Sequence, residues 1–235
     1  MKNVYFKINN TLCVIRQGKT SNEKISAKNE TIVQTYHFSE GQFNAAINKA
    51  DMKTFFSHDA AVCFDCPFAY SNGAPLNACY THKGMQYLGF KSMLRGIAKL
   101  TTWDEIPELN ADIEREILKL SKGLFIRFGT YGEPSLLPLD LTKTMCAVAK
   151  NWSGYTHQHI TRPEFAPYYM ASVHSETEAQ ALPMWRSFIA SSEAVNTAVS
   201  CPASKEQNYK SNCSKCGLCS GTEGKGKKSV NILLH

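Results

Sequence analysis

The sequence lacks any run of eighteen apolar residues, and its start, Met1 to Lys7, alternates polar and apolar residues instead of forming the apolar core of a secretion signal. We therefore expect no membrane partner and a cytoplasmic location. Low-complexity blocks are also absent, and 43% apolar with 20% charged residues is typical of an ordered globular chain. At 235 residues the chain is long enough to bury a substantial core.

Cysteine, in contrast, is plentiful: the chain has nine cysteines. In a reducing compartment such thiols are first interpreted as metal ligands or catalytic groups and only then as disulfides. Cys13 and Cys146 stand apart in apolar surroundings, so we expect them to be buried packing residues. The formal charge of +6 is compatible with a nucleic-acid partner, although a solvated lysine-rich loop at residues 225–228 also explains part of it.

The C-terminal cysteines form the strongest local motif. Cys201 is followed by Cys213, Cys216 and Cys219, and the last three are separated by two-residue gaps. Such gaps allow neighbouring sulfurs to reach one metal centre while the intervening amides turn toward them. Four thiolates suit a structural zinc or an iron–sulfur cluster, and the ligand type does not choose between the two.

An earlier group consists of Cys63, Cys66 and, after twelve residues, Cys79. Three thiolates leave one coordination position open, as a catalytic centre requires. The alternative is a structural zinc completed by a nearby histidine, His58 or His82.

Strand-like and helix-like segments alternate from Gly123 onward, which predicts an α/β fold with a parallel sheet, open or closed as a partial βα barrel. Residues 1–60 are predicted to form an N-terminal β extension with a hairpin around Asn9 and Asn10, and residues 61–235 an α/β barrel-like domain that includes the cysteine cluster 201–219. The predicted helices are 84–100, 110–122, 139–150 and 176–185, and the predicted later strands are 124–128, 154–157, 168–173, 188–190 and 230–234.

Three loops follow predicted strands and are expected on one rim, at residues 129–134, 156–159 and 172–176. They supply the candidate catalytic residues Glu133, His157 and His174. A metal-binding pair of His157 and His159, as in rolling-circle nucleases, is weakened by Gln158, which stands where that motif has an apolar residue.

The motifs together resemble a family encoded largely by bacteriophages and mobile elements. The resemblance covers roughly residues 60–235 and rests on a cysteine group ending in Cys79-Tyr80, on Gly132-Glu133-Pro134, on Gly154 to His157, on Ala171-Ser172, and on Cys201-Pro202-Ala203 through Cys219. It implies a phage-type protein in the cytoplasm of a bacterial host cell, but no particular activity.

More distantly, the chain is similar to radical S-adenosylmethionine enzymes. This resemblance implies that Cys63, Cys66 and Cys79 hold an iron–sulfur cluster with one iron free for S-adenosylmethionine. Cofactor-binding roles would then fall on Tyr80, Gly132, Glu133 and Ser172. The cysteine spacing of two and then twelve residues, and Tyr131 in place of the first motif glycine, depart from that family.

Two functional hypotheses result. The first is an iron–sulfur enzyme of radical S-adenosylmethionine-like type acting on an unknown substrate. The alternative is a non-catalytic, zinc-stabilised binding module for a nucleic acid or a host protein, based on the four-cysteine group and the basic excess.

Overall fold

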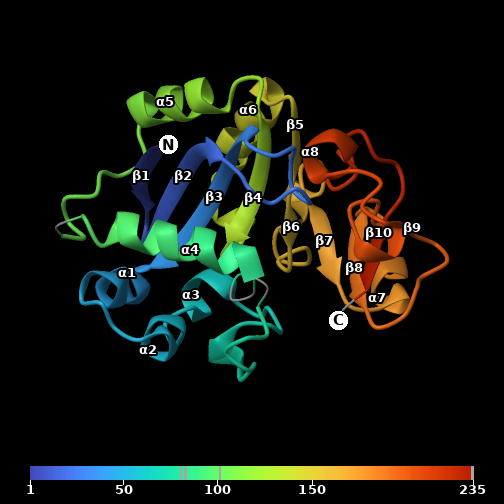
Figure 1. Ribbon diagram of the computed structural model, residues 1–235, viewed down its shortest axis with the longest axis horizontal. Helices are drawn as coiled ribbons and strands as arrows, with labels where there is room; N and C mark the ends of the chain where they lie inside the picture. Colours follow the sequence, from blue (N-terminus) through green and yellow to red (C-terminus); the bar gives the residue numbers. More distant parts are fainter. Residues whose placement is uncertain (80, 82–83, 101, 234–235) are drawn as a thin grey trace.

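The computed structural model describes residues 1–79, 81, 84–100 and 102–233. Two five-stranded sheets lie side by side, with helices packed around the first and mostly loops around the second (Figure 1). The mixed α/β class with parallel strands is thus confirmed. In the described part of the chain, every helix is too short or too polar to span a lipid bilayer.

The first sheet has the strand order β1-β2-β3-β4-β5. Its strands are β1 Lys2–Ile8, β2 Thr11–Lys19, β3 Thr31–Ser39, β4 Phe125–Tyr131 and β5 Asn151–Ser153. The predicted hairpin around Asn9 and Asn10 is confirmed, since β1 and β2 pair antiparallel with Ile8 opposite Thr11. Asn9 has φ 52°, a left-handed conformation that asparagine tolerates in tight turns.

Strand β3 was not predicted, yet it joins the hairpin to the rest of the fold. It pairs antiparallel with β2 and parallel with β4, so β1 to β3 share one sheet with β4 and β5. The proposed domain boundary at residue 60 remains a prediction. Three short helices after β3 were also not predicted: α1 Glu40–Ile47, α2 Met52–Phe56 and α3 Ala60–Cys63.

The second sheet is parallel throughout, in the order β6-β7-β8-β10-β9. Its strands are β6 Tyr155–Thr156, β7 Met170–Val173, β8 Ser187–Ser191, β9 Val199–Ser200 and β10 Val230–Leu233. The strand predicted at residues 154–157 corresponds to the shorter β6. Gly154 alone separates it from β5, which was not predicted and belongs to the first sheet. The Gly154 carbonyl accepts a hydrogen bond from the Met170 amide at 3.0 Å, which continues the pairing at the junction.

The predicted longer helices are found, with shifted ends. They are α4 Gly84–Ile97, α5 Ala111–Ser121 and α6 Leu139–Val148, followed by the short helices α7 Glu176–Gln180 and α8 Cys213–Cys216. The Asn110 side chain caps α5 by accepting hydrogen bonds from the amides of Asp112 and Ile113. The prediction of a helix to residue 185 was too long, because α7 ends at Gln180.

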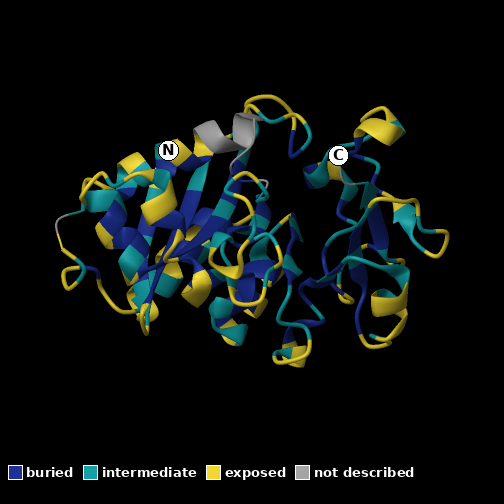
Figure 2. Ribbon diagram, turned by 90° about the horizontal axis from the view of Figure 1, so that it is seen from below, coloured by how far each residue is buried: buried dark blue, intermediate teal, exposed yellow. Residues whose placement is uncertain are grey.

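Two large apolar clusters cover the two faces of the first sheet. One includes Ile15, Val33, Ile126 and Phe128 with residues of α5 and α6. The other includes residues of α1, α2 and α4 packed on the opposite face, among them Phe38 and Phe90. Figure 2 shows buried residues concentrated in the strands and exposed residues in the outer loops and on outer helix surfaces.

Candidate metal centre in a cavity between the sheets

A cavity of about 470 Å³ lies where the two sheets meet. Its lining includes all seven cysteines of the two predicted groups: Cys63, Cys66, Cys79, Cys201, Cys213, Cys216 and Cys219. Gly132, Glu133, His157 and Ser172 line the same cavity. The fold therefore brings together segments that are more than a hundred residues apart in the chain. Tyr80, His82 and the terminal His235 lie outside the described residues.

The first cysteine group is built on the end of α3 and the turn that follows. Cys63 is the last residue of α3, and the Cys66 amide donates a hydrogen bond to the Cys63 carbonyl at 3.0 Å. The Phe68 amide in turn donates to the Cys66 sulfur. Cys79 Sγ lies 3.1 Å from Thr81 Oγ1. Amide and hydroxyl groups directed at sulfur are typical of thiolate ligands in metal sites.

Burial and like charge dominate the electrostatics of this group. Burial raises the pKa of Cys63 well above its ordinary value, and Asp59, Cys66, Cys79 and Glu133 raise it further. Burial, with Cys79 and Glu133 adding to it, raises the pKa of Cys66 to about 12. A bound cation reverses both effects, because it stabilises the thiolate and offsets the repulsion between the sulfurs.

Two hydrogen bonds fasten this group to the predicted rim. The Glu133 amide donates to the Val62 carbonyl at 2.7 Å, one residue before Cys63. Gln158 Nε2 donates to Asp65 Oδ1 at 2.7 Å. The turn that carries Cys63 and Cys66 is therefore held against the loops that follow β4 and β6.

Glu133 is a buried carboxylate, with only 5% of its surface exposed. Its Oε1 accepts a hydrogen bond from the Ser135 amide and its Oε2 one from the His157 amide, both at 3.1 Å. Burial raises the pKa of Glu133, while these hydrogen bonds and one from Thr156 oppose the rise. Within the described chain no Lys, Arg or His forms an ion pair with it.

Gly132 allows the turn that positions Glu133. Its φ is +76°, and a Cβ atom there would lie 2.8 Å from the Cβ of His37 and 2.9 Å from the His37 carbonyl oxygen. Backbone strain and this close approach both require glycine. The Gly-Glu-Pro segment is thus fixed between β3 and the cavity.

The three rim loops converge as expected from their places after strands. The rings of His157 and His174 stack with centroids 5.9 Å apart, and Phe68 packs against His174 at 5.4 Å. His157 lines the cavity, whereas His174 is not among the described lining residues and adjoins the cavity through its stacking on His157. Burial, reinforced by His174, lowers the pKa of His157 to about 4, so its imidazole is neutral at pH 7. Its Nε2 is buried without a hydrogen-bond partner among the described residues.

The C-terminal cysteine group is held by main-chain bonds to both sheets. The amides of Cys213 and Ser214 donate to the carbonyls of Lys24 and Ile25 at 3.0 and 2.9 Å, and the Gly154 amide donates to the Cys219 carbonyl at 3.0 Å. Gly217 ends α8 with φ +66°, and a Cβ atom there would lie 2.4 Å from the Asn151 side chain. Glycine is therefore required at the turn between Cys216 and Cys219.

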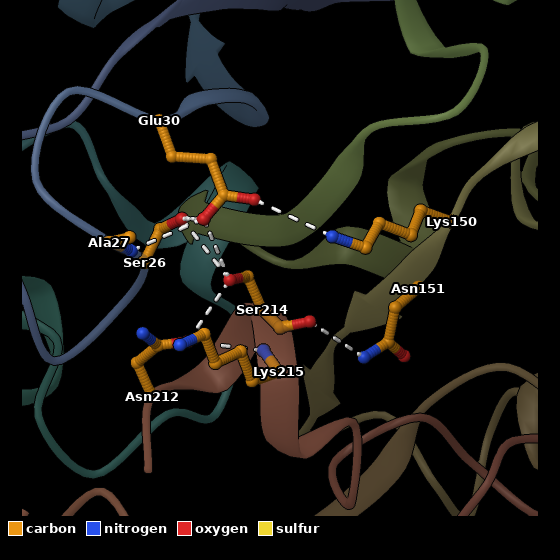
Figure 3. A network of polar contacts seen from close by, with 8 residues as sticks. All are labelled: Ser26, Ala27, Glu30, Lys150, Asn151, Asn212, Ser214 and Lys215. Atoms are coloured by element: carbon orange, nitrogen blue, oxygen red, sulfur yellow. Dashed lines mark hydrogen bonds and ion pairs between the residues drawn. The ribbon is translucent and has the colours of Figure 1, made fainter.

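A polar network around Glu30 reinforces this attachment (Figure 3). Glu30 Oε2 accepts hydrogen bonds from Ser26 Oγ and, at 3.1 Å, from Ser214 Oγ, while Oε1 lies 3.7 Å from Lys150 Nζ. Asn151 Nδ2 donates to the Ser214 carbonyl at 3.3 Å. Ser214 lies within α8, so the helix that carries Cys213 and Cys216 is anchored to the loop before β3 and to β5.

The four C-terminal thiols influence one another electrostatically. Burial raises the pKa of Cys213 to about 11, with Cys201 and Cys216 adding to the rise and Arg127 and Lys24 opposing it. Burial also raises the pKa of Cys219, and the charges of Cys213, Cys201 and Cys216 act in the same direction. The Tyr155 hydroxyl donates a hydrogen bond to the Cys219 sulfur. These thiols share one low-dielectric site.

The thiols line one cavity but do not form a closed ligand shell. Among the described residues, no three His, Cys, Asp or Glu side chains are grouped tightly enough to hold a metal ion. All nine cysteines are free thiols, so disulfides do not link them. Cys13 and Cys146 are buried in the core, as expected. His58, an alternative ligand for the first group, is exposed and does not line the cavity.

Arg127 is the main cavity residue that the sequence analysis missed. It lies in β4 between Ile126 and Phe128, and its positive charge lowers the pKa of Cys79 in one group and of Cys213 in the other, against the larger effect of burial. A charged residue between buried apolar residues of a strand was the available signal. The comparisons with known proteins add nothing to this geometry, since no family model, curated protein or solved structure matches the chain.

Proposed function

We propose that the protein is a metalloenzyme of radical S-adenosylmethionine-like type, with a cluster held by Cys63, Cys66 and Cys79 and a second metal held by Cys201, Cys213, Cys216 and Cys219. The observation that carries the proposal is that both cysteine groups, Glu133 and His157 line one cavity. In this proposal, the parallel strands from β3 to β10 form a partial barrel around it.

The first cysteine group suits an open cluster. It supplies three thiols, its sulfurs receive amide and hydroxyl hydrogen bonds, and it faces a cavity large enough for a small substrate. A cluster with one free iron would supply reductive cleavage of a bound sulfonium cofactor. Open coordination on the cavity side is what distinguishes this group from a structural site.

The Glu133 carboxylate is suited to bind the ammonium group of S-adenosylmethionine. It is buried, it forms no ion pair with a described Lys, Arg or His, and its carboxylate can accept further hydrogen bonds beyond those from Ser135 and His157. Gly132 and Ser172 line the same wall and would lie beside the cofactor. The neutral His157 imidazole would exchange a hydrogen bond or a proton with the substrate.

Anaerobic reconstitution with iron and sulfide tests the metal assignment. We expect a brown protein with visible charge-transfer absorption, and we expect the double variant Cys63→Ala/Cys66→Ala to lose only part of its iron. The matched control Cys146→Ala removes a buried thiol that does not line the cavity and should retain all the iron. A colourless protein that contains zinc alone would contradict the proposal.

Cofactor binding is tested with the reconstituted protein. Glu133→Gln keeps the size of the side chain but removes its charge, so we expect at least roughly tenfold weaker binding of S-adenosylmethionine at unchanged iron content. Glu178→Gln is the matched control, because Glu178 is exposed and is not among the described residues that line the cysteine cavity. Equal affinities of all three proteins would contradict the role of Glu133.

A specific observation also favours the second candidate, a zinc-stabilised binding module. The four-cysteine group packs into the small apolar cluster of the second sheet, where Cys201 lies with Met170, Ala203 and Val230. A structural metal at that position would stabilise the sheet without any catalysis. Zinc in both groups, together with salt-sensitive binding of nucleic acid, would support this candidate over the enzyme.

A further inference from the structure

A second cavity, of about 290 Å³, adjoins the cysteine cavity and has a different character. The two cavities share Ile25, Thr81 and Arg127 in their linings. The second one is lined by cationic and neutral polar side chains, including Arg16, Lys19, Asn22, Gln34 and Arg127. None of its described lining residues is an aspartate or a glutamate.

The cations are placed by strand register. Arg16 of β2 is directly opposite Gln34 of β3, and Gln34 is directly opposite Arg127 of β4. Side chains opposite one another on adjacent strands point to the same face of a sheet. This face is otherwise apolar, with Val14 and Tyr36 in the next row. A row of two guanidinium groups and an amide thus interrupts the apolar face.

The charges of both guanidinium groups act on one hydroxyl that lines this cavity. Burial raises the pKa of the Tyr36 hydroxyl, and the positive charges of Arg16 and of Arg127 both act against that rise. Tyr36 also lines the second cavity. Arg16, Arg127 and Tyr36 thus line one cavity, with both cations in the same row of the sheet.

Arg16 is buried, with 7% of its surface exposed, and its hydrogen-bond partners among the described residues are neutral. Its guanidinium donates to the Gly89 carbonyl at 3.4 Å, to Ser92 Oγ at 3.1 Å and to the Met1 sulfur. The ion pairs found in the described chain do not include it. A buried cation that lacks a nearby anion is costly, so an anionic ligand at this wall would offset that cost.

The loop after β2 adds groups suited to an oxyanion. Thr20, Ser21 and Asn22 line the cavity, and the Asn22 amide donates to Thr20 Oγ1 at 3.1 Å, which holds the loop in a turn. Lys19 precedes this turn and is exposed at the cavity mouth. Guanidinium, ammonium, hydroxyl and amide donors around one space match the several oxygens and double charge of a phosphate monoester better than a carboxylate.

We propose that this second cavity binds the phosphate group of a phosphate-bearing ligand, with Arg16 and Arg127 as the principal contacts. Because Arg127 belongs to both cavities, the remainder of the ligand extends past Arg127 into the cysteine cavity. This inference goes beyond the proposed enzymatic function, because phosphate binding does not require any metal at the cysteines.

Calorimetric titration of the full-length protein with methyl phosphate, at constant ionic strength, tests the proposal. We expect binding of one methyl phosphate per chain, at least roughly tenfold weaker binding in Arg16→Gln, and a smaller loss in Lys19→Gln. Lys19 is exposed, so its variant should fold even if Arg16→Gln does not. Arg115→Gln on the exposed surface of α5 is the matched charge control and should bind as the wild type does.

Acetate serves as the second probe in the same titration. Methyl phosphate binding at least roughly tenfold tighter than acetate supports the phosphate assignment. Equal binding of the two probes, no measurable binding of methyl phosphate, or the same weakening in Lys19→Gln and Arg115→Gln would overturn it. Iron content measured on the same samples separates this outcome from the metal proposal, because the two readouts do not depend on each other.

Discussion

The two sheets of the molecule are stabilised in different ways. The first sheet is covered on both faces by helices and lies between two large apolar clusters. The second sheet shares the first of these clusters on one face, through Ala171, Val173 and Ile189. Its other face has a small apolar cluster of four buried residues, Met170, Cys201, Ala203 and Val230, against which Cys213 and Cys219 pack. On this second face, cysteines thus occupy core positions that aliphatic side chains occupy in the first sheet.

This difference indicates what each half requires to stay folded. Apolar clusters cover both faces of the first sheet, whereas the face of the second sheet with the small cluster and the long loops would gain a further constraint from a metal that links several segments. The main-chain bonds from Cys213, Ser214 and Cys219 attach the second half to the first, but they do not fill its interior. The expected consequences of this difference are given below from the largest effect to the smallest.

If the C-terminal cysteines hold a metal as proposed, its loss should unfold the second half selectively. In Cys216→Ala/Cys219→Ala we expect amide exchange at residues 199–233 to accelerate by about 100-fold or more, since the constraint on this segment is removed. Exchange in β1 to β4 should change little. Hydrogen-exchange mass spectrometry measures both, with Cys146→Ala as control. Unchanged protection at residues 199–233 would show that this half is stable without metal.

Truncation in the first core should instead destabilise the whole protein. Phe38 is fully buried and its ring contacts Phe55, Phe90 and Tyr131. We expect Phe38→Ala to lower the free energy of unfolding by about 3–5 kcal/mol in urea denaturation. Phe188→Ala in the second sheet, where Phe188 is half-buried against Tyr155, should cost less. Equal losses would mean that the two halves unfold as one unit.

Buried neutral histidines should make the protein less stable in mild acid. Burial lowers the pKa of His37 to about 3, and burial together with His174 lowers that of His157 to about 4, both from an ordinary value of 6.5. As the pH is lowered, these histidines therefore bind protons at a higher pH in the unfolded chain than in the folded protein. Each contribution to stability is complete above about pH 6.5 and is lost by about 1.4 kcal/mol per pH unit as the pH falls toward the folded-state pKa, so by at most about 3 kcal/mol per histidine at pH 4.5.

Urea denaturation between pH 7.5 and pH 4.5 measures this slope. The variant His157→Gln should show a shallower pH dependence than the wild type, because one of the two histidines is removed. His58→Gln serves as control, since His58 is exposed. An identical slope in His157→Gln and the wild type would contradict the assignment of a buried neutral imidazole.

The smallest expected effect concerns the anchor between the halves. Glu30→Gln weakens the contacts with Ser26, Ser214 and Lys150, so we expect a loss of about 0.5–1.5 kcal/mol and faster exchange in α8. The exposed Glu23→Gln is the matched control.

The hydrogen bond from Ser26, opposed by desolvation, lowers the pKa of Glu30, so the stabilising contribution of Glu30 is present above about pH 4.5 and lost below it. Equal exchange of α8 in both variants would argue against this anchor.

Local patterns predicted the elements that carry their own signals. The Asn9-Asn10 turn, the apolar periodicity of α4 and α5 and the alternation after Gly123 all correspond to observed elements. Strand β3 was missed although residues 35–39 alternate polar and apolar side chains, which is a strand signal; both of its faces are nevertheless buried between β2 and β4. The short helices α1 to α3 were missed since tertiary packing, not length or propensity, stabilises them.

By itself, the sequence determined that seven cysteines fall into two groups with ligand-like spacing, and that Glu133, His157 and His174 follow strands. Spacing is a local property, so it is readable without a structure. Only the tertiary structure decided that both groups face one cavity and that Arg16, Arg127 and Tyr36 line a second one. The placement of these residues depends on the pairing of β3 with β2 and β4 and on the junction at Gly154. Strand register between distant segments is set by the packing of the whole core, so it cannot be read from local sequence patterns.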